Sequence, residues 1–116
     1  MMDSWATPKW IMRQYEEWFD PCPLNPNWET GVDGLDLEWK DKTFVNPPYS
    51  KPMPWIEKAI EEARKGKRIV MLLNVDTSTK WYSKLNEYGA HFLYFAERLH
   101  FSEGGANPKP SMLVIL

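Results

Sequence analysis

The residues Asn46-Pro47-Pro48-Tyr49 combine an amide side chain, two prolines and an aromatic ring directly after a short apolar run at 43–45. Proline fixes φ at about −65° and has no N–H group, so successive prolines hold their carbonyl oxygens rigidly and without competing donors. The side-chain oxygen of Asn46 and the carbonyl of Pro47 can then accept both hydrogens of a planar amino group, while the Tyr49 ring stacks on the heterocycle that carries it. The alternative is a proline turn that only ends a strand.

Such a grip favours the methylation of an amine. An exocyclic amine on a purine is a poor nucleophile because its lone pair is delocalised into the ring. Two acceptors that hold its hydrogens favour a more tetrahedral nitrogen, whose lone pair then points at an electrophilic methyl group. This is catalysis by orientation and electrostatic preorganisation, without a covalent intermediate. A base in a duplex must be flipped out of the stack to reach such a site, with Tyr49 replacing the lost stacking.

A strand and a helix flank the motif. Residues 43–45 predict a short strand, and ligands in open α/β sheets bind where loops leave the carboxyl ends of strands. From Pro54, apolar residues recur at helical spacing opposite a charged face, which predicts an amphipathic helix. Gly66 is expected to end this helix. The apolar face comprises Trp55, Ile56, Ala59, Ile60 and Ala63, and the charged face comprises Glu57, Glu61, Glu62, Arg64 and Lys65.

The rest of the chain continues this alternation. Residues 68–73 form a nearly continuous apolar run, typical of a strand buried on both faces. Thr77 or Ser78 is expected to cap a helix that runs through Tyr88 and ends at Gly89. Further strands are expected at 91–96, 98–101 and 111–116, with a loop between the last two. An amphipathic helix at 8–19, capped by Thr7, and a loop-rich connection at 20–42 complete a predicted compact α/β fold.

Composition and charge restrict the classes of function. The 116 residues suffice for one domain, so we expect a single domain over 1–116 without a separate target-recognition domain. A hydrophobic content of 43% argues against intrinsic disorder. The net charge of −2 gives no general basic surface, so contact with nucleic acid must come from local groups, with Arg98 and Lys109 as candidates for phosphate contacts.

Disulfides, metals and membranes are not expected. Cys22 is the single cysteine, which excludes an intramolecular disulfide and a cysteine-rich zinc site. His91 and His100 have no metal-ligand spacing with carboxylates. No stretch is apolar over a bilayer-spanning length and the first residues form no leader, so we expect a cytoplasmic protein.

The seven tryptophans divide by position. Those at apolar positions of expected helices, and therefore expected in the core, are Trp10, Trp18, Trp55 and Trp81. Those in expected loops, and therefore candidates for ligand contact, are Trp5, Trp28 and Trp39.

Several blocks together resemble one known family. The "NPPY" motif is similar to that of amino-group methyltransferases that use S-adenosylmethionine. The wider layout resembles the phage-type (Dam-like) DNA N6-adenine methyltransferases in "SWATP", "FDPCPLNPN", "DGLDLEW", "FVNPPYS", "WIEKAIEEA", "LLNVDTSTKWY", "ERLHF" and "PSMLVIL", which cover nearly the whole chain. The resemblance implies a compact, truncated Rossmann-like methyltransferase sheet with flanking helices. It also implies methyl transfer from S-adenosylmethionine to N6 of an adenine flipped out of DNA and, for a phage-encoded protein, a place in the host cytoplasm.

The resemblance also assigns residues to the two substrates. It implies that Asn46, Pro47, Pro48 and Tyr49 hold the target adenine. It places Trp5, Thr7, Pro8 and Asp20 near the methyl donor, with Cys22 beside that pocket. The alternative for Asp20 is a carboxylate that ends a helix or forms a turn, and Asp76 is expected to cap a helix. The sequence departs from the usual pattern in having no glycine-rich loop after a first strand.

Two alternative functions stay open on the sequence. The same chemistry can serve an RNA base or the side-chain amide of a protein glutamine. A non-catalytic, aromatic-rich module would instead bind single-stranded nucleic acid by stacking. The enzyme interpretations require affinity for the methyl donor and the binding module does not. The oligomeric state is left open.

Overall fold

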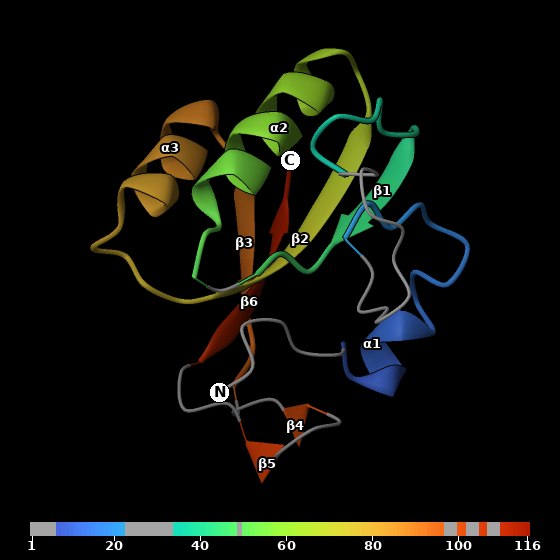
Figure 1. The fold of residues 1–116 in the computed structure, drawn as a ribbon. Helices are drawn as coiled ribbons and strands as arrows, with labels where there is room; N and C mark the ends of the chain where they lie inside the picture. The colour runs from blue at the N-terminus through green and yellow to red at the C-terminus, as the bar shows by residue number, and fades with distance from the viewer. Residues whose placement is uncertain (1–6, 23–33, 49, 97–99, 102–104, 107–109) are drawn as a thin grey trace.

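The computed structural model describes residues 7–22, 34–48, 50–96, 100–101, 105–106 and 110–116. Its centre is a four-stranded sheet in the order β1-β2-β6-β3, formed by Lys42–Val45, Arg68–Asn74, Ser111–Ile115 and His91–Tyr94. β1 runs parallel to β2, while β6 runs antiparallel to both β2 and β3. Strands β1, β2 and β3 therefore point the same way, and their carboxyl ends share one edge of the sheet (Figure 1).

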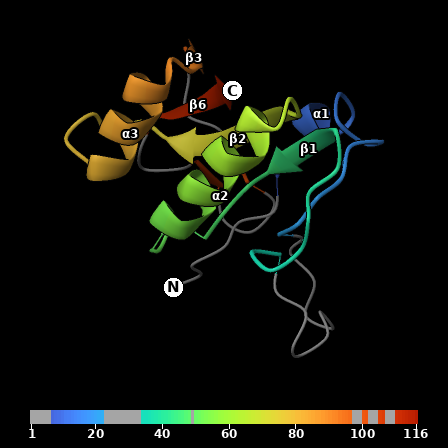
Figure 2. The ribbon, with the colours of Figure 1, turned by 90° about the horizontal axis from the view of Figure 1, so that it is seen from above.

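Helices cover the sheet unequally on its two faces. The helices α2 (Met53–Arg64) and α3 (Lys80–Tyr88) lie together on one face, each of them joining two strands that point the same way (Figures 1 and 2). The short helix α1 (Lys9–Met12) contributes Ile11 to the core on the other face, where it lies with Phe44, Leu72 and Leu113. The α/β architecture with flanking helices predicted from the sequence is confirmed in this form.

Strand β2 shows why the sequence pattern was informative. Ile69, Met71 and Leu73 pack into the cluster that contains the apolar face of α2, whereas Val70 and Leu72 pack on the opposite side. All five residues are buried. The nearly continuous apolar run at 68–73 is thus a strand buried on both faces, as predicted.

The ends of the two long helices follow local chemistry. Gly66 and Gly89 have φ of 94° and 93°, so each ends its helix in the left-handed conformation that glycine adopts readily. The cap of α3 is Thr79, whose hydroxyl accepts the N–H of Tyr82 at 3.2 Å, and the prediction of Thr77 or Ser78 was wrong by one or two residues. The Asp76 carboxylate does not cap α3 but accepts the N–H and the hydroxyl of Ser78 in the preceding turn.

The predicted helix over 8–19 is wrong beyond its first turn. α1 ends at Met12, and Pro8, not Thr7, occupies the cap position. The reason lies in a tertiary contact: Phe19 donates its N–H to the Lys42 carbonyl and accepts the N–H of Phe44, both at 2.9 Å. This parallel bridge extends the sheet beyond β1 by one residue and draws the chain out of a helix.

The tryptophans depart from two expectations. Trp10 is half exposed, at 50%, although its spacing predicted a core position. Trp39 is 1% exposed and belongs to the core, although its place in a loop predicted ligand contact. Trp55 is buried as predicted, Trp18 and Trp81 are partly buried, and the remaining two lie outside the described residues.

Two short strands complete the description. β4 (His100–Phe101) and β5 (Gly105–Ala106) form an antiparallel pair, so the expected strand at 98–101 is confirmed at its end, and part of the following expected loop is a strand. No helix within the described ranges is long and apolar enough to cross a bilayer.

Candidate functional site

Four strand ends meet at the edge of the sheet where Asn46 lies. Asn46 directly follows β1, and β2 and β3 end at the same edge with Asn74 and Tyr94. Because β6 runs the other way, it begins there: Ser111 pairs with Asn74 and Met112 with Tyr94. The expected position of Asn46, at the carboxyl end of a strand in an α/β sheet, is confirmed.

Asn46 is joined to the amino-terminal part of the chain by its side chain. Its amide nitrogen Nδ2 donates to the hydroxyl oxygen Oγ1 of Thr7 at 3.1 Å. In this orientation of the amide, Nδ2 faces the Thr7 hydroxyl and Oδ1 is the acceptor at the other end. It also brings a residue predicted to face the methyl donor into contact with one predicted to hold the target base.

Asp20 approaches the same edge through the bridge at Phe19. Since Phe19 lies parallel to β1 beside Thr43, the residues that follow it run toward the carboxyl end of that strand. Burial raises the pKa of the Asp20 carboxyl, although the N–H of Cys22, which donates to its Oδ1 at 2.9 Å, acts in the opposite direction. Asp20 is therefore a half-buried carboxylate in a tight turn, and Cys22 packs against the core.

The other predicted site residues occupy different environments. Pro8 is buried, and its carbonyl starts α1 by accepting the N–H groups of Ile11 and Met12, each at 3.0 Å. Pro47 is buried and Pro48 is half-buried beside Asn46. Two other predicted site residues, Tyr49 and Trp5, lie outside the described residues, and so do Arg98 and Lys109.

Glu62 is a buried charge that the sequence pattern did not predict. It was expected on the charged outer face of α2, yet it is fully buried and meets three lysine side chains, Lys58 at 3.3 Å, Lys65 at 3.3 Å and Lys67 at 2.8 Å. Burial alone would raise the pKa of Glu62, but hydrogen bonds from Lys67, the Trp39 N–H and the other lysines outweigh it and lower the pKa to about 2. The bond to Glu62 in turn raises the pKa of Lys67.

Trp39 connects this carboxylate to the segment that contains Asp20. Its backbone N–H donates to Glu62 Oε1 at 3.1 Å, and its indole Nε1 donates to the Gly34 carbonyl at 2.8 Å. Gly34 lies so close to Pro21 that an added Cβ would come within 1.9 Å of the Pro21 carbonyl oxygen. The lysines at 58, 65 and 67 are the one signal in the sequence that Glu62 could be buried and ion-paired. No signal in the sequence indicates that Trp39 is buried.

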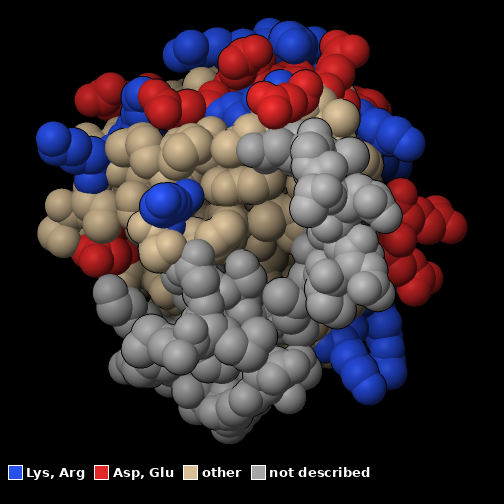
Figure 3. Space-filling view, viewed as in Figure 1, with Lys and Arg blue, Asp and Glu red and all other residues tan. Residues whose placement is uncertain are grey.

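Charged side chains are most crowded in one part of the view in Figure 3. Both signs of charge crowd the top of that view, near the end of α2 and the start of β2, and few lie over the middle of the face. No group of three potential metal ligands occurs among the residues that the structure describes. Among the described charges, Glu62 pairs with Lys58, Lys65 and Lys67.

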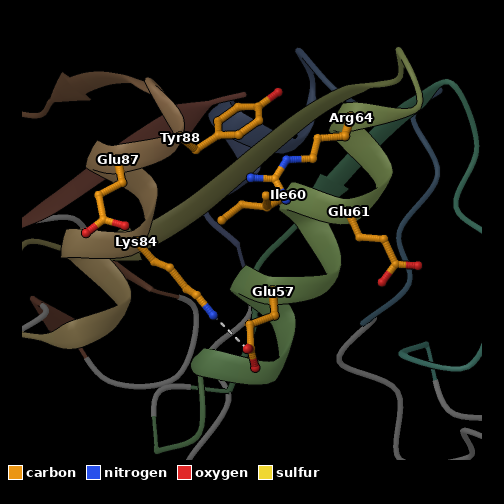
Figure 4. Close-up of a pocket in the computed structure, with 7 residues that line it drawn as sticks. All are labelled: Glu57, Ile60, Glu61, Arg64, Lys84, Glu87 and Tyr88. Atoms are coloured by element: carbon orange, nitrogen blue, oxygen red, sulfur yellow. Dashed lines mark hydrogen bonds and ion pairs between the residues drawn. The ribbon is translucent and has the colours of Figure 1, made fainter.

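A surface pocket lies between α2 and α3 and holds none of the predicted site residues (Figure 4). Its walls carry both signs of charge, with Lys84 paired to Glu57 at 2.8 Å and the Arg64 guanidinium 5.9 Å from the centre of the Tyr88 ring. The residues that line it are Glu57, Ile60, Glu61, Arg64, Lys84, Glu87 and Tyr88. The pocket thus presents both signs of charge, with three glutamates beside one lysine and one arginine.

Comparison with known proteins identifies relatives along the full chain. Residues 1–116 match the family model described as DNA N-6-adenine-methyltransferase (Dam). The chain is 33% identical to the DNA N-6-adenine-methyltransferase of Haemophilus phage HP1 (strain HP1c1) over 134 residues, covering 97% of this chain and 78% of that protein. It is 37% identical to the protein of the same name from Escherichia phage T1 over 105 residues, covering 79% of this chain and 44% of that protein. No solved structure matches the chain.

Proposed function

The chain belongs to the DNA N-6-adenine-methyltransferase (Dam) family. We propose that a methyl group is transferred from S-adenosylmethionine to adenine at the edge of the sheet that carries Asn46. The reaction class follows from the family: the chain is a DNA N6-adenine methyltransferase. The observation that carries the assignment to this edge is the 3.1 Å hydrogen bond between Asn46 Nδ2 and Thr7 Oγ1. This bond joins Asn46, which we assign to the target adenine, to Thr7, which we assign to the methyl donor, at the carboxyl end of β1.

On the target side, Asn46 and Pro47 act as a pair of acceptors. Thr7 holds the nitrogen end of the Asn46 amide, so Oδ1 is the end that receives one N6 hydrogen of the adenine. The Pro47 carbonyl receives the other. With both hydrogens held, the N6 lone pair is directed out of the ring plane toward the methyl group. The Tyr49 ring stacks on an adenine that has been flipped out of the DNA stack.

On the donor side, the charge of Asp20 fits the charge of the donor. S-adenosylmethionine, when bound, supplies a positively charged, electrophilic methyl sulfonium group. A half-buried carboxylate attracts a cation and accepts hydrogen bonds from hydroxyl or ammonium groups more strongly than an exposed one does. The near contact of Gly34 with Pro21 supports a close-fitting backbone at this point, because even one added carbon would collide there. We assign Thr7, Pro8 and Cys22 to the donor side as well, and the assignment of Trp5, which lies outside the described residues, stays a prediction from the sequence.

The sheet itself fits a shortened Rossmann-like methyltransferase. Parallel strands β1 and β2 are joined through α2, and β2 and the similarly directed β3 through α3, an arrangement that gathers ligand sites at the carboxyl edge. A longer sheet would have a further strand beside β1, and in the described part of this chain Phe19 alone pairs at that position. The Phe19 bridge directs the residues after it toward the carboxyl end of β1, and the sequence has no glycine-rich loop for this purpose.

A paired binding and transfer experiment tests this function. We expect the purified protein to bind S-adenosylmethionine in a calorimetric titration and to transfer labelled methyl to adenine-containing DNA. RNA and a glutamine-containing peptide, offered side by side with the DNA, should accept little label. Binding of DNA with neither donor affinity nor methyl transfer would instead identify a non-catalytic module that stacks on bases.

A further inference from the structure

We propose that Trp39 is a positioning residue for the donor pocket: held by the buried Glu62, its indole sets the segment from Asp20 to Cys22 through Gly34. The inference rests on the proposed donor role of that segment. Trp39 touches neither the donor nor the adenine in this assignment, so its effect reaches the reaction only through the backbone that it holds.

Every polar group of Trp39 has a defined partner. The N–H donates to Glu62, the carbonyl accepts from the Lys67 ammonium, and the indole N–H donates to the Gly34 carbonyl. The side chain is also 1% exposed, within the main core cluster. A residue fixed by packing and by three hydrogen bonds has little freedom to move, which is what a support for a binding segment requires.

The contact from Gly34 to Pro21 transmits that position. Pro21 lies between Asp20 and Cys22, whose hydrogen bond of 2.9 Å closes the turn around it. Because Gly34 approaches the Pro21 carbonyl so closely, a displacement of Gly34 toward Pro21 must displace the turn as well. The Asp20 carboxylate would then move relative to the donor.

Trp39 also contacts the helix that follows the target-side turn. Its ring stacks on Trp55 of α2, with ring centres 6.3 Å apart and planes at 23°. α2 begins at Met53, a few residues after the Asn46-Pro47-Pro48-Tyr49 motif of the sequence. One indole thus lies between the segment that carries Asp20 and the helix that leads away from Asn46.

The buried charge of Glu62 is consistent with an orienting role. An apolar side chain would fill this place without the desolvation that a carboxylate suffers and that three lysines must offset. What an apolar residue cannot do is accept the Trp39 N–H. The carboxylate fixes the backbone of Trp39, while Lys67 bonds both to that carboxylate and to the Trp39 carbonyl.

The test measures donor affinity, the KM for each substrate and kcat separately. Trp39→Phe keeps an aromatic ring but removes the indole N–H together with part of the ring volume in the core, so its melting curve is recorded alongside its donor affinity. We expect calorimetry to show an affinity for S-adenosylhomocysteine about tenfold weaker, the size of effect typical of one lost hydrogen bond. The KM for S-adenosylmethionine should rise similarly, while kcat at saturating donor and the KM for DNA stay within about twofold.

Two glycine variants make a matched comparison. Gly34→Ala should weaken donor binding at least as much as Trp39→Phe, because its methyl group collides with Pro21. The Cβ of Gly89→Ala meets no atom within 4 Å, but a φ of 93° strains any residue other than glycine, so this variant should have a lower melting temperature and an unchanged donor affinity. Melting curves of Trp39→Phe, Gly34→Ala and Gly89→Ala show whether a loss of donor affinity results only from a loss of stability.

Each outcome is decisive. Wild-type donor affinity in folded Trp39→Phe and Gly34→Ala would overturn the positioning role and leave the proposed function intact. Absence of donor binding and methyl transfer in the parent protein would instead remove the proposed function itself. If Trp39→Phe melts below the assay temperature, Gly34→Ala decides the question, because it leaves the Trp39 side chain unchanged and alters the contact of Gly34 with Pro21.

Discussion

The amide nitrogen of Asn46 lies 3.1 Å from the hydroxyl oxygen of Thr7, across 39 positions of sequence. Two segments that the sequence separates by a long irregular connection thus share one hydrogen bond at the edge of the sheet. If Asn46 holds the adenine and Thr7 borders the donor, this bond fixes the spacing between the reacting nitrogen and the methyl group. Positioning of that kind is a large component of catalysis by orientation.

Removal of the Thr7 hydroxyl should reduce turnover without unfolding the protein. Thr7→Val keeps the shape of the side chain but cannot accept from Asn46 Nδ2, so we expect kcat to fall about tenfold. Thr7→Ser retains the hydroxyl and should restore most of the rate in the same methyl-transfer assay. Thr77→Val, the same change at an exposed position, serves as the control. Equal losses in the valine and serine variants would show that the hydroxyl is not the cause.

Asn46→Ala should abolish most of the turnover while the fold persists. Loss of one preorganised group at a reacting centre typically lowers kcat by about 100-fold or more, and we expect a loss of that order in single-turnover methyl transfer. Donor affinity by calorimetry should change little, because Asn46 is assigned to the adenine. Asn86→Ala on the exposed side of α3 provides the matched substitution. Turnover near the parent rate in Asn46→Ala would rule out the acceptor role.

Asp20→Asn should separate stability from donor binding. Burial raises the pKa of Asp20 above its ordinary 3.8, so ionised Asp20 opposes folding at pH values above that range, and the neutral amide relieves this while still accepting the Cys22 N–H. We therefore expect an unchanged or higher melting temperature at pH 7 together with donor affinity lowered by about tenfold or more. Asp36→Asn, at an exposed position, should alter neither quantity. Parent-like donor affinity would leave Asp20 as a turn residue.

Glu62 should make folding sensitive to acid. Its pKa falls from the ordinary 4.5 to about 2 in the folded protein, so its contribution is complete above pH 4.5 and is lost as the pH falls toward 2. Glu62→Gln keeps an acceptor but removes the charge, and we expect a loss of about 2 kcal/mol in urea unfolding at pH 7. The difference from the parent should narrow at pH 3. For the exposed control Glu61→Gln, the free energy of unfolding should differ from that of the parent no less at pH 3 than at pH 7. A difference between Glu62→Gln and the parent that is the same at both pH values would contradict the proposed stabilising role of the Glu62 charge.

Elements governed by local pattern could be predicted from the sequence, whereas those governed by distant contacts could not. The strand predicted at 68–73 and the helix predicted from Pro54 follow from apolar spacing, and they are found at Arg68–Asn74 and Met53–Arg64. The amino-terminal helix was overextended because Phe19 pairs with β1, and no local signal announces that pairing. At the site, the strand-end position of Asn46 was predictable from its place after an apolar run.

The supports of the site were not predictable for the same reason. Glu62 has helical spacing typical of an exposed charge, and only the lysines folded around it make its burial tolerable. Trp39 lies in a stretch without periodicity, so its burial depends on Gly34, Trp55 and Glu62, which come from other parts of the chain.

The reversed direction of β6 has a consequence for how such an enzyme can diversify. Since β3 ends and β6 begins at the same edge, the connection between them leaves and returns on the side of the sheet that bears Asn46. Residues can therefore be inserted there without changing the register of any strand pair. We expect length variation between relatives to be tolerated best at this connection, because the strand pairs on either side of it stay as they are.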